Sequence, residues 1–209
     1  MQKISIEGNI GSGKSTILKA IKQLNNDQIV FVDEPVDEWV SIKNSNGKNA
    51  LQLFYENQKD NSFWFQIMAY ITRLRNFFDV LEKNKDKIII CERSIYTDKF
   101  VFAEMLYDMG YIKEIEWKTY LYWFDTFKDK TNLDLIIYVN TEPEECYNRI
   151  KIRNRNEEKD KITLEYLKSC HEKHIKWLEN TQTKIITING HQSIDSIHSL
   201  IKTTDFNNL

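Results

Sequence analysis

The chain has 209 residues, of which 29% are charged and 41% hydrophobic, and a formal net charge of −2 at pH 7. This composition excludes an intrinsically disordered chain, and the length suits one domain, residues 1–209, with a sizeable core. A nearly neutral chain offers no electrostatic reason to bind nucleic acid or a membrane surface. No apolar run approaches the ~18 residues that a membrane span needs. We therefore expect a globular, soluble protein with no nucleic-acid and no membrane partner.

The three cysteines, Cys91, Cys146 and Cys170, favour a reducing compartment. Their number is odd and none has CxxC spacing, which argues against a disulfide framework and against a zinc site. The first predicted strand begins by Lys3, so no leader peptide is expected before the fold, although a chain whose leader had already been removed would begin in the same way. A cytoplasmic location is therefore expected.

Five short apolar runs predict strands covered on both faces, at residues 3–7, 29–32, 87–91, 133–139 and 184–188. Helical segments are predicted between and after them, at about residues 14–24, 61–83, 98–109, 114–130, 142–152, 164–179 and 193–202. This alternation predicts an α/β fold: a five-stranded parallel sheet flanked by helices, with right-handed crossovers. A ligand crevice is then expected at the carboxyl ends of the strands.

The first strand is followed by a glycine-rich segment that fits the P-loop pattern Gly-x4-Gly-Lys-Ser/Thr. It consists of Gly8, Asn9, Ile10, Gly11, Ser12, Gly13, Lys14, Ser15 and Thr16. Glycines let successive backbone N–H groups cradle a phosphate chain, and the following helix adds its positive N-terminal end. Lys14 can reach the β- and γ-phosphates, and the Ser15 hydroxyl can ligate Mg²⁺. The segment therefore predicts binding of a nucleoside triphosphate together with Mg²⁺.

Acidic residues follow the second and third predicted strands. Glu34 precedes Pro35, which holds it extended at the sheet rim, where a carboxylate can act as general base for an attacking hydroxyl. An exposed turn glutamate is the alternative. Glu92 lies where P-loop enzymes usually have a Mg²⁺-linked carboxylate, and Arg93 can bridge to Glu34 or to the phosphates. A structural ion pair at a strand end would produce the same pattern.

An arginine cluster indicates a lid at about residues 149–160. Arg149 and Arg153 are four residues apart and share a helix face, and Arg155 lies just beyond them. Arginines on a mobile segment can close over a triphosphate and neutralise charge that develops in the transition state. A solvated, charged helix end is the commoner meaning of such a run, but the P-loop favours the lid.

The predicted helix 61–83 offers a pocket for an acceptor that bears a hydroxyl group. Gln66, Ala69 and Arg73 are three and four residues apart and so share one face. The small alanine leaves room for a planar polar ligand beside the two polar side chains. Asp98 could pair with Arg73 and orient it.

With these residues in place, the sequence resembles the deoxynucleoside kinase family, in its deoxycytidine/deoxyguanosine/deoxyadenosine kinase-like branch. The matching pieces occur in family order, at residues 8–16, 34–39, 65–66, 92–98, 149–158 and 164–167. The resemblance implies a P-loop kinase with an arginine-bearing lid. Its reaction would be Mg²⁺-dependent transfer of the ATP γ-phosphate to the 5′-hydroxyl of a deoxynucleoside, in nucleotide salvage.

The resemblance also implies roles at the reacting end of the site. Glu34 would be the base that activates the 5′-hydroxyl, with Arg93 beside it. Glu92 and Ser15 would serve Mg²⁺. The phosphates would be held by the P-loop with Lys14, and by Arg149, Arg153 and Arg155.

At the nucleoside end, the resemblance implies that Tyr55 and Glu158 hydrogen-bond the 3′-hydroxyl. Gln66 would read the edge of the base. The walls around it would be Trp39, Phe65 and Phe102. Such a pocket is physically sensible, because apolar walls supply contact area and a few polar groups supply orientation.

Base choice is expected to depend on Ala69, Arg73 and Asp98. Family members with these residue types suit deoxycytidine and purine deoxynucleosides. Arg73 and Asp98 put a donor and an acceptor where the thymine methyl would need room. The hypothesis is that deoxyadenosine, deoxyguanosine or deoxycytidine is favoured over thymidine.

Other classes fit part of the pattern. A nucleoside monophosphate kinase, such as a thymidylate kinase, shares the sheet, P-loop and lid, but Glu34 and Glu158 suit a neutral sugar better than a phosphorylated acceptor. A non-enzymatic relative usually loses the P-loop lysine or the base, whereas Lys14 and Glu34 are both present. A GTPase would need an Asn-Lys-x-Asp motif, which this sequence lacks.

The resemblance finally implies a homodimer built from helices that flank the segment 61–83. The aromatic stretch 117–127 is a candidate surface, because Trp117, Tyr120, Leu121 and Phe124 fall on one helix face. Ordinary core packing is an equally good interpretation of these four side chains.

Overall fold

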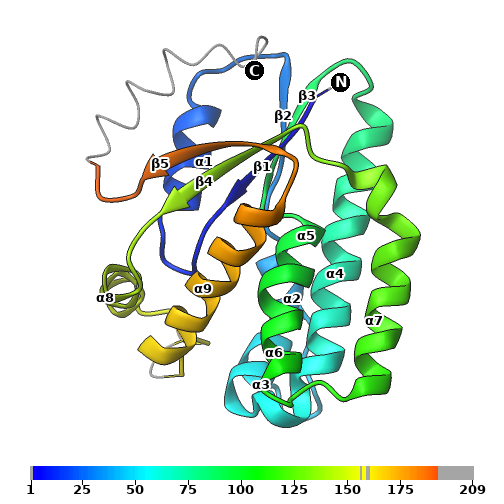
Figure 1. Ribbon diagram of the computed structural model, residues 1–209, viewed down its shortest axis with the longest axis vertical. Helices are drawn as coiled ribbons and strands as arrows, with labels where there is room; N and C mark the ends of the chain where they lie inside the picture. Colours follow the sequence, from blue (N-terminus) through cyan, green and yellow to red (C-terminus); the bar gives the residue numbers. More distant parts are fainter. Residues whose placement is uncertain (1, 156, 159–160, 193–209) are drawn as a thin grey trace.

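One parallel sheet forms the centre of the molecule (Figure 1). The computed structural model describes residues 2–155, 157–158 and 161–192. Its strands are β1 (Lys3–Glu7), β2 (Ile29–Val32), β3 (Ile88–Glu92), β4 (Leu135–Asn140) and β5 (Lys184–Asn189), in the spatial order β2-β3-β1-β4-β5. All neighbouring strands pair in parallel, which confirms the predicted α/β fold and five-stranded sheet.

Two strands begin later than predicted, because pairing with their neighbours sets their ends. β3 begins at Ile88, which pairs with Ile29, and it continues through Glu92, which pairs with Ile6. β4 begins at Leu135, which pairs with the second residue of β1. Glu92 is therefore held by the sheet itself rather than by the loop after it.

The helical segments of the described chain are α1 (Lys14–Lys22), α2 (Val36–Ser41), α3 (Ala50–Glu56), α4 (Gln58–Lys83), α5 (Ile95–Thr97), the π-helix η1 (Asp98–Ala103), α6 (Glu104–Asp108), α7 (Glu114–Phe127), the 3₁₀ helix η2 (Lys128–Thr131), α8 (Pro143–Arg153) and α9 (Leu164–Asn180). The predicted helix 98–109 is wrong as one element, because its first turns are π-helical. The predicted helix 114–130 gives way to a 3₁₀ turn after Phe127. The predicted helix 193–202 lies outside the described residues.

Short helices α2 and α3 are absent from the prediction. α3 does have a local start signal: the Asn49 side chain accepts from the Gln52 amide, and the Gln52 side chain accepts from the Asn49 amide. This is a capping box, with asparagine in place of serine or threonine. The helix is only seven residues long, so its apolar periodicity covers about two turns and does not distinguish it from a loop in the sequence.

Helices cover both faces of the sheet (Figure 1). On one face α1 packs its apolar side, including Ile17 and Ile21, against residues of β1 and β4 such as Ile137. On the other face Ile136 and Tyr138 of β4 join a larger core with α4, α7 and α9. Alternate residues of each strand thus face two different cores, which explains why the strands are apolar along their length.

The surface of α7 differs from the expected dimer face. Tyr120 and Phe124 are buried in the core of this chain, so they follow the core interpretation. The exposed apolar side chains of α7 are instead Ile115, Tyr122 and Trp123. No helix in the described part of the chain combines the length and the hydropathy of a membrane span.

Candidate active site

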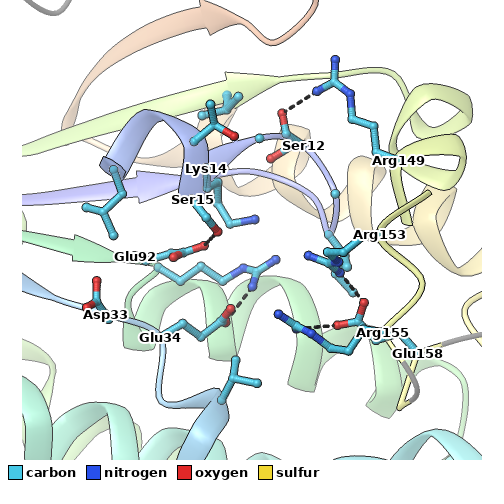
Figure 2. Close-up of a pocket in the computed structure, with 18 of the residues that line it drawn as sticks. Ser12, Lys14, Ser15, Asp33, Glu34, Glu92, Arg149, Arg153, Arg155 and Glu158 are labelled. Atoms are coloured by element: carbon cyan, nitrogen blue, oxygen red, sulfur yellow. Dashed lines mark hydrogen bonds and ion pairs between the residues drawn. The ribbon is translucent and has the colours of Figure 1, made fainter. Parts of the chain in front are cut away.

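A cavity of about 810 Å³ opens at the carboxyl ends of the strands, as the fold predicts (Figure 2). It is lined by the P-loop after β1, by Glu34 after β2 and by Glu92 and Arg93 at the end of β3. Gly190, directly after β5, also lines it. The cavity brings together all of the predicted site residues except Gly8 and Asn9 at the start of the P-loop.

The P-loop has the backbone shape that a phosphate cradle requires. Gly11 and Gly13 have φ of 79° and 103°, in the region that favours glycine, and a Cβ on Gly11 would lie 2.6 Å from the Cys146 carbonyl oxygen. Gly13 precedes α1 without any side-chain cap. The first N–H groups of α1 are therefore free of a capping side chain, and the positive end of the helix faces the cavity.

Lys14 and Asn9 are linked within the loop. The Lys14 ammonium donates to the Asn9 carbonyl oxygen at 2.8 Å, and burial lowers the pKa of Lys14 to about 8. The Asn9 side chain points away from the cavity and donates to the Leu167 carbonyl of α9 at 2.8 Å. Any contact of Asn9 with a triphosphate thus depends on its backbone, while its side chain ties the loop to α9.

Ser15 and Glu92 form the part of the site that suits Mg²⁺. The Ser15 hydroxyl donates to Glu92 Oε1 at 2.8 Å. Among the described residues no three His, Cys, Asp or Glu side chains lie close enough to hold a metal ion. Mg²⁺ usually takes one or two protein oxygens and completes its shell with water and phosphate oxygens. A hydroxyl and a carboxylate beside a phosphate cradle fit that donor set.

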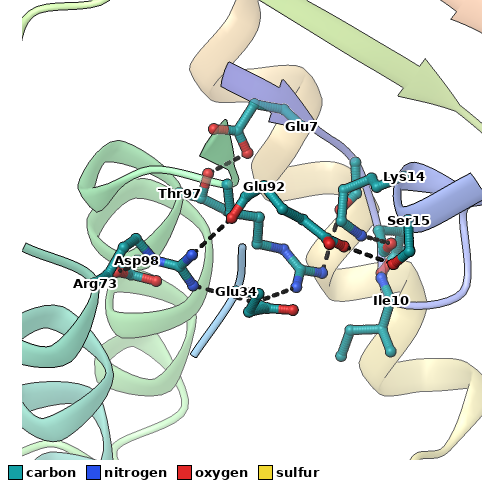
Figure 3. Close-up of polar contacts among 12 residues, drawn as sticks. Glu7, Ile10, Lys14, Ser15, Glu34, Arg73, Glu92, Thr97 and Asp98 are labelled. Atoms are coloured by element: carbon teal, nitrogen blue, oxygen red, sulfur yellow. Dashed lines mark hydrogen bonds and ion pairs between the residues drawn. The ribbon is translucent and has the colours of Figure 1, made fainter. Parts of the chain in front are cut away.

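Glu34 lies in a buried network of charges (Figure 3). Its Oε1 accepts from Arg93 Nη1 at 2.6 Å and from Arg73 Nη2 at 3.1 Å. Arg73 also donates from Nε to Asp98 Oδ2 at 2.9 Å and from Nη1 to the Glu92 carbonyl at 2.8 Å. The expected pairings of Arg93 with Glu34 and of Arg73 with Asp98 are thus both present.

The electrostatics of this network keep Glu34 ionised. Burial alone would raise the pKa of the Glu34 carboxyl, but the charges of Arg93 and Arg73 outweigh it and lower the pKa to about 2. The Glu34 side chain is only 16% exposed, so the alternative of an exposed turn glutamate does not apply. A carboxylate held in this way is charged at every physiological pH and can accept a proton.

Aromatic side chains form the walls of the part of the cavity that the resemblance assigns to the nucleoside. Phe65 stacks on Phe54 of α3 at 4.4 Å between ring centroids, and Trp39 lies edge-on to Phe65 at 5.5 Å. Trp39 is fixed by an indole N–H bond to Thr72 Oγ1 at 2.9 Å. The Arg93 guanidinium lies over the Phe102 ring at 5.1 Å from the centroid. Other residues that line the cavity include Tyr55, Gln66 and Ala69.

Some wall residues are missing from the sequence prediction. Leu51 and Phe54 of α3, and Tyr166 of α9, also line the cavity. The capping box before α3 was the available signal for the first two. Nearby, burial and then the charge of Glu158 raise the pKa of the Tyr55 phenol, so that it stays a hydrogen-bond donor.

The three arginines near residue 150 have partners within the protein. Arg153 pairs with Glu158 Oε2, and Arg155 Nη1 donates to Glu158 Oε1 at 2.8 Å (Figure 2). Arg149 donates to the carbonyl oxygens of Ser12 at 3.2 Å and Gly190 at 2.9 Å. Arg149 and Arg153 belong to α8, so the first part of the predicted lid, 149–153, is regular helix, and the chain leaves it at Asn154 with φ of 51°.

A comparison with protein-family models gives a kinase family, which agrees with the P-loop and the charged residues of this site. The model of the deoxynucleoside kinase family matches residues 4–204, and the chain belongs to that family. It is a kinase that phosphorylates nucleosides with ATP as donor, in nucleotide salvage.

Named relatives share much of the chain. A probable deoxycytidine kinase of fowlpox virus is 39% identical over 197 residues, which cover 90% of this chain and 79% of the viral protein. The deoxycytidine kinase of Homo sapiens is 40% identical over 198 residues, 85% of this chain and 75% of the human protein. The mitochondrial deoxyguanosine kinase of Xenopus laevis is 32% identical over 203 residues, 88% of this chain and 76% of the frog protein.

Proposed function

We propose that the enzyme transfers the γ-phosphate of ATP, with Mg²⁺, to the 5′-hydroxyl of deoxycytidine, deoxyadenosine or deoxyguanosine in preference to thymidine. The single observation that supports this choice is the buried Arg73–Asp98 pair at 2.9 Å in the wall of the cavity. Relatives named as deoxycytidine and deoxyguanosine kinases are consistent with it.

The pair supports this base preference because its position is rigid. Arg73 is held by Asp98, by Glu34 and by the Glu92 carbonyl, so its guanidinium has little freedom to turn aside. A buried donor and acceptor that a base leaves unpaired cost binding energy, and a thymine methyl offers neither partner. Gln66, which is also buried, supplies a donor and an acceptor for the edge of the base.

We assign the reacting end as follows. Glu34 accepts the proton of the 5′-hydroxyl, and Arg93 holds Glu34 in place. Because the transition state of phosphoryl transfer is loose, the proton moves late, when the hydroxyl has become acidic enough for a carboxylate of low pKa. Ser15 and Glu92 would hold Mg²⁺, which supplies neutralisation of charge on the phosphate oxygens when bound.

The donor phosphates are assigned to the P-loop, Lys14 and the arginines of the lid. These cations surround the cavity from two sides, so they can neutralise charge as it shifts to the leaving group. Tyr55 and Glu158, which line the same cavity, are assigned to the 3′-hydroxyl.

We also propose a single domain, a homodimer and a cytoplasmic location. Exposed apolar side chains on neighbouring helices, Ile71 of α4 with Ile115, Tyr122 and Trp123 of α7, support the dimer. The three cysteines are free and buried, which supports a reducing compartment. A monomeric mass in solution would remove the dimer.

The test is ATP consumption, with Mg²⁺, in the presence of deoxyadenosine, deoxyguanosine, deoxycytidine, thymidine or thymidine monophosphate. Turnover of any of the first three above thymidine is the expected result. If thymidine turned over best among the four nucleosides, the proposed preference would be wrong. Turnover of the monophosphate alone would contradict the roles of Glu34 and Glu158.

A further inference from the structure

Glu7 is a buried carboxylate that the proposed mechanism leaves unused. It is the last residue of β1, directly before the P-loop, and it has no exposed surface. Three hydroxyl groups donate to it: those of Ser5 and Ser94 to Oε1, the latter at 2.8 Å, and that of Thr97 to Oε2. A carboxylate with three donors on its two oxygens is fixed in one orientation.

Two of these donors come from a segment that supplies several parts of the site (Figure 3). Ser94 and Thr97 lie between Glu92, which faces Ser15, and Asp98, which holds Arg73. The Glu7 side chain thus joins the strand that leads into the P-loop to the segment 92–98. Residues of this segment are assigned to the metal, the acceptor hydroxyl and the base. The third donor, Ser5, lies on β1 itself, so its bond to Glu7 connects β1 to no other element.

The backbone pairing between β1 and β3 ends before Ser94 and Thr97. β1 and β3 pair as far as Ile6 with Glu92, and the Arg93 amide donates to the Ile6 carbonyl at 3.0 Å. Arg93 then has φ of 62°, which is far from strand geometry and uncommon for a residue with a side chain. A residue in such a conformation is held there by its surroundings. The hydroxyl bonds of Ser94 and Thr97 to Glu7 are contacts of that kind, one and four residues further on.

We propose that Glu7 is a positioning residue, which sets the distance between the phosphate donor on the P-loop and the acceptor hydroxyl at Glu34 by anchoring the segment 92–98 to the end of β1. It acts through Ser94 and Thr97, and it does not line the cavity. The inference rests on the proposed function, because the distance matters only if donor and acceptor react here. Since a misplacement of about 1 Å can cost ~10²-fold in rate, the loss should appear in kcat.

The experiment compares Glu7→Gln and Thr97→Val with the matched controls Ser5→Ala and Thr97→Ser. Steady-state kcat and KM are measured with deoxycytidine and ATP at a temperature well below every Tm. We expect kcat of Glu7→Gln and Thr97→Val to fall by about 10- to 100-fold, with both KM values within about threefold of wild type. Ser5→Ala and Thr97→Ser should keep nearly the wild-type kcat. The double variant Glu7→Gln/Thr97→Val should be little worse than Glu7→Gln alone.

Several results would overturn the proposal. These are an unchanged kcat in Thr97→Val, a loss confined to KM, or an equal loss in Ser5→Ala, which would indicate general packing. If Glu7→Gln does not fold, Thr97→Val decides, because it keeps the branched side-chain shape and replaces the hydroxyl that donates to Glu7 with a methyl group. The wild-type enzyme distinguishes a failure of the proposed function from a failure of the role of Glu7. If it phosphorylates no deoxynucleoside, the proposed function fails. If it is active and the variants keep its kcat, only the role of Glu7 fails.

Discussion

The two ends of the cavity, which we assign to the phosphate acceptor and to the phosphate donor, hold their charges in different ways. At the acceptor end, Glu34, Arg73, Arg93 and Asp98 pair with one another, and none of their side chains is more than 16% exposed. At the donor end, Lys14 donates to a backbone carbonyl. Arg153 and Arg155 share one carboxylate, that of Glu158, with their own side chains 38% and 36% exposed.

This difference indicates that the two ends of the cavity affect different kinetic parameters. Charges that are paired and desolvated inside the protein are already in position before the reaction, which is the arrangement that stabilises a transition state. Arg153 and Arg155 are each more than a third exposed and share the buried Glu158 carboxylate, so one of them can turn to phosphate while the other keeps Glu158 paired. Substitutions at the acceptor end should therefore act on kcat and on base choice. Substitutions at the donor end should act on the affinity for ATP.

The largest effect is expected for Glu34→Gln. The amide keeps the shape of the side chain but cannot accept the proton, so kcat should fall by about 10³-fold, within the range of general-base catalysis. The Kd for deoxycytidine should stay within about threefold, measured by calorimetry. Glu38→Gln is the control, because Glu38 pairs with Arg75 on the surface and should keep the wild-type kcat. A variant with more than a tenth of the wild-type kcat would exclude Glu34 as the base.

Asp98→Asn should change base choice. Without its charged partner Arg73 is less well oriented, so kcat/KM for deoxycytidine should fall by about 10- to 100-fold, whereas that for thymidine should change by less than about fivefold. Asp108→Asn, which removes an exposed partner of Lys173, is the control for a general loss of charge. Equal losses for both nucleosides would show that Asp98 supports the fold rather than the choice of base.

Lys14 should make ATP binding depend on pH. Its pKa of about 8 in the empty site means that about nine-tenths of the lysines are neutral at pH 9, while phosphate binding needs the charged form. The affinity for Mg²⁺–ATP should thus fall about tenfold between pH 7 and pH 9, with proton uptake on binding at the higher pH. Calorimetry in buffers of different ionisation enthalpy measures both quantities.

The matching control is Lys14→Ala, in which binding is weak and this pH dependence is lost.

The free energy of unfolding of the empty protein should change with pH in the opposite direction to the affinity for ATP. The unfolded chain binds more protons than the folded one between pH 8 and the ordinary lysine pKa, so this lysine destabilises the fold less as pH rises through that window. Pairing at the acceptor end gives no comparable effect near pH 8, since the Glu34 pKa is about 2.

Sequence predicted the residues around the cavity more completely than the packing behind them. The P-loop is a local pattern, and residues after parallel strands meet at one edge of a sheet, so Lys14, Glu34 and Glu92 could be placed without a structure. The helix face that Gln66, Ala69 and Arg73 share also followed from their spacing, and all three line the cavity. These predictions depend on short-range geometry.

Contacts between distant parts of the chain could not be predicted in the same way. The Asn9 side chain bonds to Leu167, 158 residues away, so its direction depends on where α9 packs. Two of the three hydroxyl groups that donate to Glu7 come from Ser94, just after β3, and from Thr97 of α5, and no spacing rule brings them to β1. The pairing of both Arg153 and Arg155 with Glu158 likewise depends on the path of the chain after α8.

The smallest effect, and the sharpest test of the comparison, is expected for Glu158→Gln. Glu158 holds Arg153 and Arg155 in the empty site, so the variant should release both for phosphate and lower the KM for ATP. We expect a factor of about 2 to 5, because both arginine side chains are more than a third exposed and water screens part of their pairing. It should also raise the KM for deoxycytidine, because the same carboxylate is assigned to the 3′-hydroxyl. Opposite shifts of the two KM values would distinguish an exchange of partners from damage to the site.

Glu145→Gln is the matched control for that exchange. Glu145 also pairs with an arginine of α8, Arg149, whose side chain is 32% exposed, close to the 38% of Arg153. The Glu145 side chain is 36% exposed and that of Glu158 only 5%, and Arg149 already donates to the carbonyl oxygens of Ser12 and Gly190. Its loss should leave the KM for ATP within experimental error. If Glu145→Gln lowered that KM as much as Glu158→Gln, the net charge of the region would explain the result. A rise in the KM for ATP in Glu158→Gln would mean that Glu158 orients the arginines for phosphate, and the donor end would then be as fixed as the acceptor end.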